Sequence, residues 1–333
     1  MIKATPIMKF RTEIDIKPWS DPIGYDTHIT CLGSCFASNI ARRLQRHKFN
    51  VVDSPTGILF NPASIAKSVD MMLRATEGEQ VVSASNMVKL DCRYVNYDFH
   101  SAISGATPEE ATQTMQQRLF EGGWALKGSD LVIITLGTAW CYELLESGRV
   151  VANCHKQSAK LFNRRLLSVA EVVEALTNIT ETLNGRVVFT VSPVRHIGEG
   201  MEDNALSKAI LRVAVAEVCA CYDKGVDYFP SYEIMMDDLR DYRFYDNDMV
   251  HPSSIAVDYI AEKFFDAVLT NGAKALMQRV QKVVSAAEHR PFDPSSEAYK
   301  TFCLKQLADI AAMPNVDFSE EKSHFEQMLQ INL

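Results

Sequence analysis

The sequence predicts an α/β fold in which a five-stranded parallel sheet carries helices on both faces. Apolar runs rich in valine and isoleucine alternate with segments of helical periodicity over residues 28–269. Strands that are buried on both faces have such runs, and strand–helix alternation is typical of parallel sheets. Five strands are expected, near residues 30, 52, 134, 189 and 228.

Each expected strand is a short apolar run, and the helices follow from periodicity and from their start signals. The strands are predicted over His28 to Leu32, Val51 to Val52, Leu131 to Leu136, Val187 to Val191 and Val226 to Phe229. The helices are predicted over Ser38 to Arg46, Pro62 to Arg74, Ser168 to Leu183, Asn204 to Tyr222 and Pro252 to Leu269. Ser168 and Glu171 have the spacing of a capping box, and Pro62 and Pro252 suit a first helical turn.

Two segments that lack this alternation are expected to form β-hairpin insertions that wall a pocket. Lys89 to Ser101 alternates like a β-ribbon, and Cys141 to His155 reads as a hairpin that turns at Ser147 and Gly148. After about residue 273 three helical segments follow one another. We therefore expect an α/β domain over residues 1–272 and a helical extension over residues 273–333, packed on it as a lid or an oligomer contact.

Composition and charge argue against several classes of partner. The chain of 333 residues has 34 Lys and Arg against 42 Asp and Glu, a formal net charge of −8, and no long basic block. Neither a nucleic-acid surface nor a polybasic membrane surface is therefore expected. There is no run of about 18 apolar residues that would predict a transmembrane helix, and residues 1–18 lack the apolar stretch of a signal peptide.

The eight cysteines are scattered through a chain that is large enough to build its own core. Without an export signal they are expected to be reduced thiols, which indicates a cytoplasmic protein. No Gly-rich phosphate loop follows a strand, so no cofactor is expected. No cysteines and histidines have a zinc spacing, so no metal site is expected. Homo-oligomerisation is left open.

Residues that directly follow the strands are the candidates for chemistry, because ligands of an open parallel sheet bind at the carboxyl ends of its strands. Three such segments follow strands, and a fourth precedes the last helix of the α/β domain. The segments are Gly33 to Cys35, Gly137 to Trp140, Ser192 to His196 and Asp246 to Pro252.

Cys35 is the candidate nucleophile, because it lies in a turn between a strand and a helix. Gly33 permits the tight turn. The helix start directs unpaired N–H groups and a positive dipole end at the sulfur of Cys35, which favours the thiolate. The alternative is a small apolar cysteine buried under the helix. Ser34 is the alternative nucleophile.

Asp248 and His251 are the candidate orienting acid and base. Their spacing lets the carboxylate fold back onto the imidazole, hold one ring N–H and leave the other nitrogen free as a base. Together with Cys35 they would complete a Cys–His–Asp arrangement. The alternative is that Asp248 caps the following helix and His251 is a surface residue.

The run Gly33-Ser34-Cys35-Phe36-Ala37 with Asp248 and His251 downstream resembles the GSCFA family, a branch of the SGNH/GDSL-like hydrolase superfamily. The resemblance implies a three-layer α/β/α, flavodoxin-like core with an SGNH-type site for ester hydrolysis or acyl transfer. It extends over roughly residues 30–260 and includes Leu136 to Ala139, Asn153 to Lys156, Ser192 to His196, Tyr228 to Glu233 and Arg240 to Tyr245.

The motifs of the superfamily fit this chain with two departures. Its first motif reads Gly-Asp-Ser and then an apolar residue, so that a gapless match places Cys35 at the nucleophile and Ser34 at the Asp. Its Gly-x-Asn-Asp motif, whose Asn helps to bind the oxyanion, reads Gly137-Thr138-Ala139-Trp140 here, without an amide. The oxyanion donor must then be another group. The candidates are the Cys35 backbone N–H, Gly57, the Thr138 hydroxyl and Asn61.

Most of the remaining candidates could have a purely structural role instead of a role in binding or catalysis. Gly57 could serve only a turn, and Asn61 could serve only as a helix cap. His196 is expected at the same sheet edge, as a substrate-binding residue or an alternative base. Arg195 and Arg243 are candidates to hold an anionic group, or they are ion-pair partners within the fold.

The sequence therefore predicts an acyl-ester hydrolase. His251, oriented by Asp248, would take the proton of Cys35 or of Ser34, which attacks a small or carbohydrate-linked acyl ester. The first alternative is an acyltransferase with the same site, because an alcohol can intercept a thioester intermediate. The second alternative is a catalytically inactive module that binds a carbohydrate or a nucleotide, which the missing oxyanion Asn favours.

Overall fold

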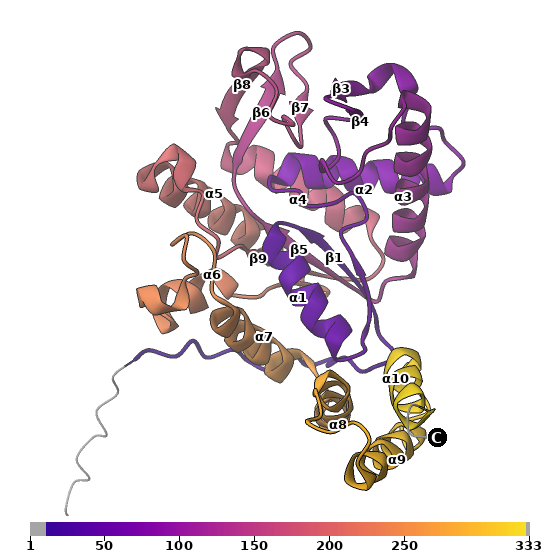
Figure 1. Cartoon of the computed structure of the whole chain (residues 1–333). Coiled ribbons are helices and arrows are strands. Elements are labelled where there is room, and N and C mark those ends of the chain that lie inside the picture. Colours follow the sequence, from indigo (N-terminus) through magenta and orange to yellow (C-terminus); the bar gives the residue numbers. More distant parts are fainter. Residues whose placement is uncertain (1–10, 331–333) are drawn as a thin grey trace, which may run out of the picture.

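A five-stranded, all-parallel sheet forms the centre of the protein, in a computed structural model that describes residues 11–330 (Figure 1). The strands lie in the order β2-β1-β5-β9-β10, and neighbours pair in parallel. Counted along the chain this is the 2-1-3-4-5 order of flavodoxin-like sheets, so the predicted fold class is confirmed. The strands are β1 His28–Gly33, β2 Asn50–Asp53, β5 Leu131–Leu136, β9 Arg186–Val191 and β10 Val226–Tyr228.

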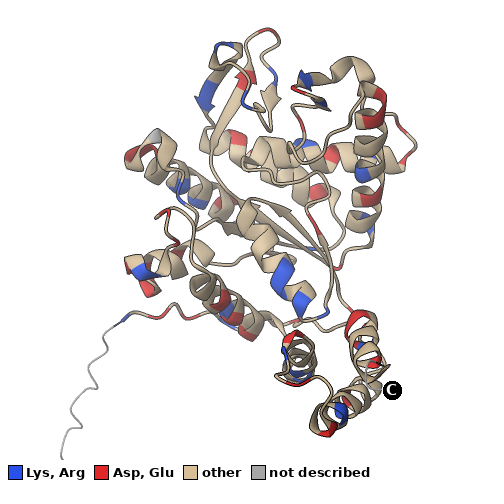
Figure 2. Ribbon diagram, viewed as in Figure 1, with Lys and Arg blue, Asp and Glu red and all other residues tan. Residues whose placement is uncertain are grey.

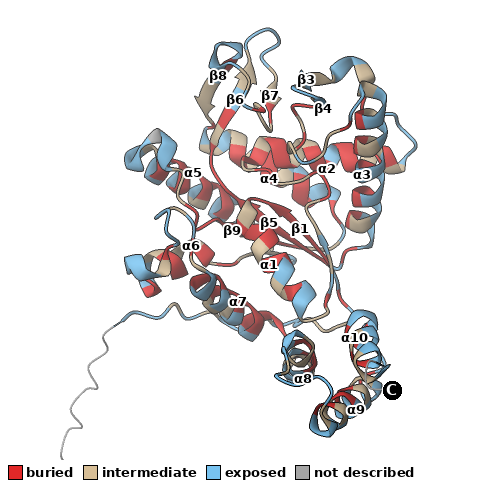
Figure 3. Ribbon diagram, viewed as in Figure 1, coloured by how far each residue is buried: buried red, intermediate tan, exposed pale blue. Residues whose placement is uncertain are grey.

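Helices cover both faces of this sheet and make a three-layer α/β/α core. Along β5, Val132 and Ile134 pack with α2 to α5, whereas Leu131 and Ile133 pack with α1 and α7 on the other face. This alternation is what a strand buried on both faces requires, and Figure 3 shows the strands buried between the helices. The helices are α1 Cys35–Arg46, α2 Pro62–Thr76, α3 Pro108–Gly128, α4 Val169–Thr182, α5 Met201–Ala220 and α7 Ser254–Val268.

Two small antiparallel sheets interrupt the alternation, near the positions predicted for hairpins. The first pairs β3 Val88–Leu90 with β4 Arg93–Val95. The second has the order β7-β6-β8, and its β6–β7 hairpin turns at Ser147 and Gly148 as predicted. Its strands are β6 Trp140–Leu144, β7 Val150–Val151 and β8 Phe162–Leu166. The strand β8 was not expected from the sequence.

The long helix α3 is also absent from the sequence prediction. Its signals are present: Thr107 is the N-cap and accepts a hydrogen bond from the Glu110 N–H, and Ala111, Met115 and Leu119 are buried at helical spacing. The pair Gly122 and Gly123 obscures the periodicity. A Cβ atom on Gly123 would lie 2.1 Å from the Met72 carbonyl oxygen of α2, so glycine allows the two helices to pack closely.

Three helix starts differ from the prediction by two or three residues, and one of them is α5, which begins at Met201 instead of Asn204. Helix α1 begins at Cys35, because the Ser34 hydroxyl already caps it. Helix α7 begins at Ser254 with Ser253 as its N-cap, so the expectation that Pro252 occupies the first turn is wrong. The capping box of Ser168 and Glu171 at the start of α4 is confirmed. Between β10 and α7 lie the short α6 Ser231–Glu233 and a π-helical turn over Ile234–Asp238.

Three helices at the C-terminal end form an extension with a core of its own, around Val280, Cys303 and Phe325. Ion pairs of Arg46 with Glu288 and of Lys48 with Glu321 join this extension to the end of α1 that is opposite Cys35. That end lies about 18 Å from Cys35 along the helix, and Figure 1 shows the extension away from the carboxyl ends of the strands. The extension therefore does not form a lid over them. Its helices are α8 Asn271–Glu288, α9 Glu297–Ala311 and α10 Ser319–Gln330.

The surface carries both signs of charge. In Figure 2 basic and acidic residues are interspersed over the helices, and neither sign forms a continuous face in this view. Within residues 11–330, none of the helices is both long and apolar enough to cross a membrane.

Gly33 ends β1 in a backbone conformation that only glycine adopts readily. Its φ is +116°, and a Cβ atom there would lie 2.1 Å from the Thr135 carbonyl oxygen. We expect Gly33→Ala to lower the free energy of unfolding by more than about 3 kcal/mol, since strained φ adds to displaced pairing of β1 with β5. Gly148→Ala is the matched control, because its φ is +66° and no atom lies within 4 Å; we expect a loss of about 1 kcal/mol. Equal losses in chemical denaturation would contradict this account.

Candidate active site

The order of the strands reverses between β1 and β5, and the loops after β1, β5 and β9 meet there (Figure 1). Ligands of open α/β sheets bind in the crevice outside such a reversal point. Backbone hydrogen bonds join these segments: the Ser34 N–H donates to the Thr135 carbonyl of β5 at 3.0 Å, and the Ser192 N–H, directly after β9, donates to the Leu136 carbonyl of β5 at 2.8 Å. The Gly137 N–H donates to the carbonyl of Phe60, in the segment after β2, at 2.8 Å. The candidate residues on these loops are therefore held in fixed relative positions.

Cys35 and Ser34 differ in their freedom to react. Ser34 is 1% exposed, and its hydroxyl oxygen accepts the Phe36 N–H at 3.3 Å as the N-cap of α1. Cys35 is the first residue of α1 and is partly exposed. Among the described residues, the Cys35 N–H has no acceptor. Cys35 is thus more exposed than Ser34, and its backbone N–H is an unused donor within the described residues.

The N–H groups at the helix start favour the Cys35 thiolate as expected, but their effect is smaller than that of burial. Burial raises the pKa of the Cys35 thiol, and it outweighs the N–H groups of Cys35 and Phe36 and the cations Lys208 and Arg42, which lower it. Cys35 is therefore mainly a thiol at neutral pH, and a base is needed to remove its proton.

The Asp248 carboxylate folds back onto the imidazole of His251, as the sequence spacing predicts. Asp248 Oδ2 lies 2.6 Å from His251 Nδ1, and Asp248 Oδ1 accepts the backbone N–H of His251 at 2.9 Å. The backbone N–H of His251, then its ring, then the Val250 N–H lower the pKa of Asp248 to about 2. Asp248 does not cap a helix, since Ser253 does. The carboxylate stays ionised and fixes Nδ1 as the donor, which leaves Nε2 as the acceptor.

A closed loop carries this pair and attaches it to the carboxyl edge of the sheet. The Asp246 N–H donates to the His251 carbonyl at 2.7 Å, and Tyr245 forms a bridge with Pro252 at the base of the loop. The Arg195 N–H, directly after β9, donates to the Val250 carbonyl at 3.1 Å. Asp248 and His251 themselves are about half exposed.

Lys208 of α5 is a charged group in this site that sequence reasoning missed. It is 2% exposed, and its ammonium donates to the carbonyls of Gly137 at 2.6 Å and of Ser192 at 2.7 Å. Burial lowers its pKa to about 7, while the Cys35 thiolate raises it. A lysine within a helical pattern is usually a solvated residue, so its only signal was its place on the helix after β9.

His196 lies beside this lysine and is held neutral. Burial, Lys208 and His251 lower its pKa to about 4. Its Nε2 atom is buried and makes no hydrogen bond within the described part of the chain. The centroids of the His196 and Phe60 rings lie 5.7 Å apart in an edge-to-face arrangement. His196 therefore offers an unused neutral nitrogen. A base with this pKa is weaker than an ordinary histidine.

The side chains of the two candidate arginines contact other residues, away from Lys208 and His196. The Arg195 guanidinium stacks on Tyr245 at 3.8 Å and lines a separate hollow of about 210 Å³ with Tyr242 and Arg240. The Arg243 side chain is 74% exposed and lies 3.7 Å from Asp241. The structure gives both arginines local partners and shows neither of them in the pocket described below.

The candidate oxyanion donors differ in availability. The Gly57 N–H already donates to the Ser54 carbonyl at 2.7 Å, which makes Gly57 a turn residue with φ of +82°. The Thr138 hydroxyl is bonded to Ser207 at 3.0 Å and accepts the Trp140 N–H. Asn61 caps α2 through its amide oxygen, and its amide nitrogen makes no hydrogen bond among residues 11–330. The free donors are therefore the Asn61 amide nitrogen and the Cys35 N–H.

A pocket of about 450 Å³ opens beside these groups. Asn61, Thr138 and His196 form its inner side, and the β6–β8 insertion forms its outer wall. The expectation that both insertions wall a pocket is met by the second one alone: Trp140, Tyr142, Asn153 and Phe162 line this pocket, and no residue of Lys89 to Ser101 does.

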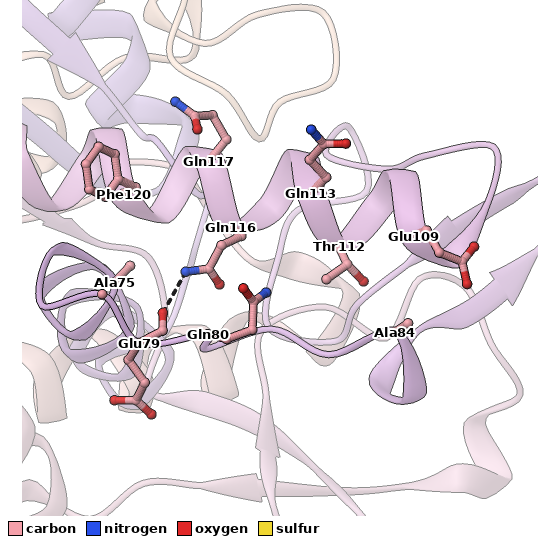
Figure 4. Close-up of a pocket in the computed structure, with 11 residues that line it drawn as sticks. Ala75, Glu79, Gln80, Ala84, Glu109, Thr112, Gln113, Gln116, Gln117 and Phe120 are labelled. Carbon is pink, nitrogen blue, oxygen red and sulfur yellow. Dashed lines mark hydrogen bonds between the residues drawn. The ribbon is translucent and has the colours of Figure 1, made fainter.

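A further hollow of about 630 Å³ lies between α3 and the segment after α2 (Figure 4). Several glutamines line it, and Gln116 donates to the Glu79 carbonyl at 2.7 Å. No Ser, Cys or His side chain lines this hollow. It reaches Ala75 at the end of α2 opposite Asn61, so it is remote from the strand ends. Among residues 11–330 no group of three or more His, Cys, Asp and Glu is placed to hold a metal ion.

The chain belongs to the GSCFA family, whose family model matches residues 28–264. A second model, described as the C-terminal domain of GSCFA domain proteins, matches residues 280–331. No curated protein matches the chain. The first match contains Cys35, Asp248 and His251, and the second contains most of the helical extension.

The buried ammonium of Lys208 makes stability depend on pH. The pKa of Lys208 is about 7 in the folded protein against an ordinary value of 10.5. Between these values the unfolded chain binds the proton that the folded chain has released, so a rise in pH stabilises the fold. We expect the free energy of unfolding of the wild type, minus that of Lys208→Met, to rise by about 3–5 kcal/mol from pH 7 to pH 10.

Chemical denaturation across this pH range measures the difference. The exposed Lys305→Met is the matched control, for which the difference should stay flat. A flat difference for Lys208→Met as well would show that the buried lysine is not destabilised by its charge.

Proposed function

We propose that this member of the GSCFA family is an acyl-ester hydrolase with Cys35 as nucleophile, His251 as general base and Asp248 as the residue that orients His251. The observation that carries the proposal is the 2.6 Å contact between His251 Nδ1 and Asp248 Oδ2. It occurs on a loop that is bonded to the carboxyl end of β9, on the sheet edge where α1 begins with Cys35. A carboxylate, an imidazole and a thiol on one sheet edge are the parts of a nucleophilic acyl-transfer site.

The first half-reaction forms a thioester. His251 Nε2 takes the proton of Cys35 as the sulfur attacks the ester carbonyl carbon, and the C–O bond to the alcohol breaks as His251 returns the proton to the leaving oxygen. Water then attacks the thioester with its proton passing to His251, and the sulfur leaves and recovers the proton. The raised pKa of the Cys35 thiol supports a concerted role for the base instead of a preformed thiolate.

The Cys35 N–H and the Asn61 amide nitrogen are the proposed oxyanion donors. Both are free of other acceptors within residues 11–330, and such donors are typically worth about 3–4 kcal/mol of barrier each. They would replace the Asn that is absent from Gly137 to Trp140. This substitution argues for an active enzyme over an inactive binding module.

The superfamily of the protein and its location in the cell are part of the same proposal. The 2-1-3-4-5 strand order, a nucleophile after β1 and an Asp-x-x-His segment before α7 support membership of the SGNH/GDSL-like superfamily. Eight free cysteines support a reducing, cytoplasmic location. An acyltransferase is the second candidate, because the 450 Å³ pocket could hold an acceptor alcohol that intercepts the thioester in place of water.

A burst assay with 4-nitrophenyl acetate tests the assignment of the nucleophile. The wild type should release about one nitrophenol per active site in the burst, and Cys35→Ala should release none. Ser34→Ala should keep the burst and lose about 0.5–2 kcal/mol of stability, because it removes only a helix cap. Loss of the burst in Ser34→Ala with retention in Cys35→Ala would transfer the nucleophile to Ser34.

The base is tested by acylation rates in the same assay. His251→Ala should slow acylation by on the order of 10²–10⁴-fold, and Asp248→Asn should slow it as well by removing the acceptor that fixes the ring. The chain offers a matched pair, because exposed His28 contacts Asp130 at 3.3 Å at the opposite end of β1. His28→Ala should leave the acylation rate unchanged. Equal effects of His251→Ala and His28→Ala would contradict the proposed base.

A further inference from the structure

The 450 Å³ pocket beside the site has no charged residue in its lining. Its apolar surface comes largely from the rings of Phe60, Trp140, Tyr142 and Phe162. Its polar groups are amides, the hydroxyls of Thr138 and Tyr142, a thiol and His196, whose pKa of about 4 keeps the ring neutral. No Asp, Glu, Lys or Arg side chain lines it.

Several of the polar groups in this pocket have no partner in the protein. The side-chain amide nitrogen of Asn61 and the side-chain amide of Gln157 make no hydrogen bond among the described residues. The Nε2 atom of His196 is buried and has none either. Residues with unpaired neutral donors and acceptors thus line the same pocket as four aromatic side chains.

The wall that carries Gln157 is fixed by a buried histidine. Both ring nitrogens of His155 are bonded, Nδ1 to the Ser101 hydroxyl and Nε2 to the Asn96 carbonyl, each at 2.8 Å. His155 and Lys156 have φ of 49° and 55°, which is unusual for residues other than glycine. The insertion is thereby joined to the segment after β4, and the pocket is largely formed in advance of binding.

We propose that this pocket binds a neutral sugar ring, which carries the ester that Cys35 attacks. The C–H faces of the ring would lie on the aromatic side chains, and its hydroxyls would bond to Asn61, Gln157 and His196. This inference rests on the proposed hydrolase for its link to catalysis, while the sugar site itself does not require turnover.

Two other ligand classes fit the lining less well. An anionic group would find no cation in the pocket lining, because the nearby Lys208 ammonium already donates to the Gly137 and Ser192 carbonyls, and burying an unpaired anion is costly. A long acyl chain would cover the rings and leave the amides and His196 unpaired, which costs free energy for each buried polar group. A neutral sugar ring can cover the aromatic rings and also form hydrogen bonds with the unpaired polar groups.

Calorimetric titration of Cys35→Ala protein tests the site without turnover. The probes are 3-O-acetylglucose and its anionic counterpart, 3-O-acetylglucuronate. The glucose ester should bind at least tenfold more tightly. Gln157→Lys places a cation in the pocket and should remove or reverse this preference, whereas Gln113→Lys, at the remote hollow of Figure 4, should not. Equal binding of both probes, no binding of the glucose ester, or equal effects of the two lysines would overturn the inference.

Hydrolysis of 4-nitrophenyl acetate by the wild type, measured in parallel, separates the two proposals. Turnover without the binding preference contradicts the sugar site alone. The binding preference without any turnover contradicts the hydrolase and supports the sugar site.

Discussion

The parallel strand order of the sheet is the constraint on which the candidate site depends. Because every strand points the same way, the loops after β1, β5 and β9 must end at one edge, and the order reverses between β1 and β5. Short backbone bonds then fix these loops to one another, such as the Ser34 N–H to the Thr135 carbonyl and the Arg195 N–H to the Val250 carbonyl. Cys35 and the Asp248–His251 pair, which are over two hundred positions apart in the sequence, are thereby placed on a common edge.

The charge of Lys208 acts on several titratable side chains at this edge of the sheet. Its ammonium is buried between the ends of β5 and β9, and it acts on both Cys35 and His196: it lowers the pKa of each. For Cys35 this opposes the effect of burial, and for His196 it adds to that effect. The consequence is that the His196 ring stays neutral, whereas His251 lies on a half-exposed loop in contact with Asp248.

Features that depend on residues close together in the sequence were predictable, whereas features that depend on contacts between distant segments were not. The strand β5 follows from an unbroken apolar run, and the Asp248–His251 contact follows from a spacing of three residues. Helix α3 was missed because Gly122 and Gly123 interrupt its apolar pattern, although close packing on α2 is their reason. The effect of burial on the Cys35 thiol and the role of Lys208 depend on which distant segments cover them, so no local pattern shows them. Ser34 is a different case, since its hydroxyl caps α1 through the Phe36 N–H only two residues further on, which is a local contact.

The most direct test of the central claim is to locate the acyl group after reaction with 4-nitrophenyl acetate. Acid quench, peptide mapping by mass spectrometry and treatment with neutral hydroxylamine identify the modified residue and distinguish a thioester from an oxygen ester. The account predicts one acetyl group on the peptide that contains Cys35, removed by hydroxylamine at neutral pH and absent from Cys35→Ala protein. An acetyl group on Ser34, or no acetyl group on any residue of this loop, would contradict it.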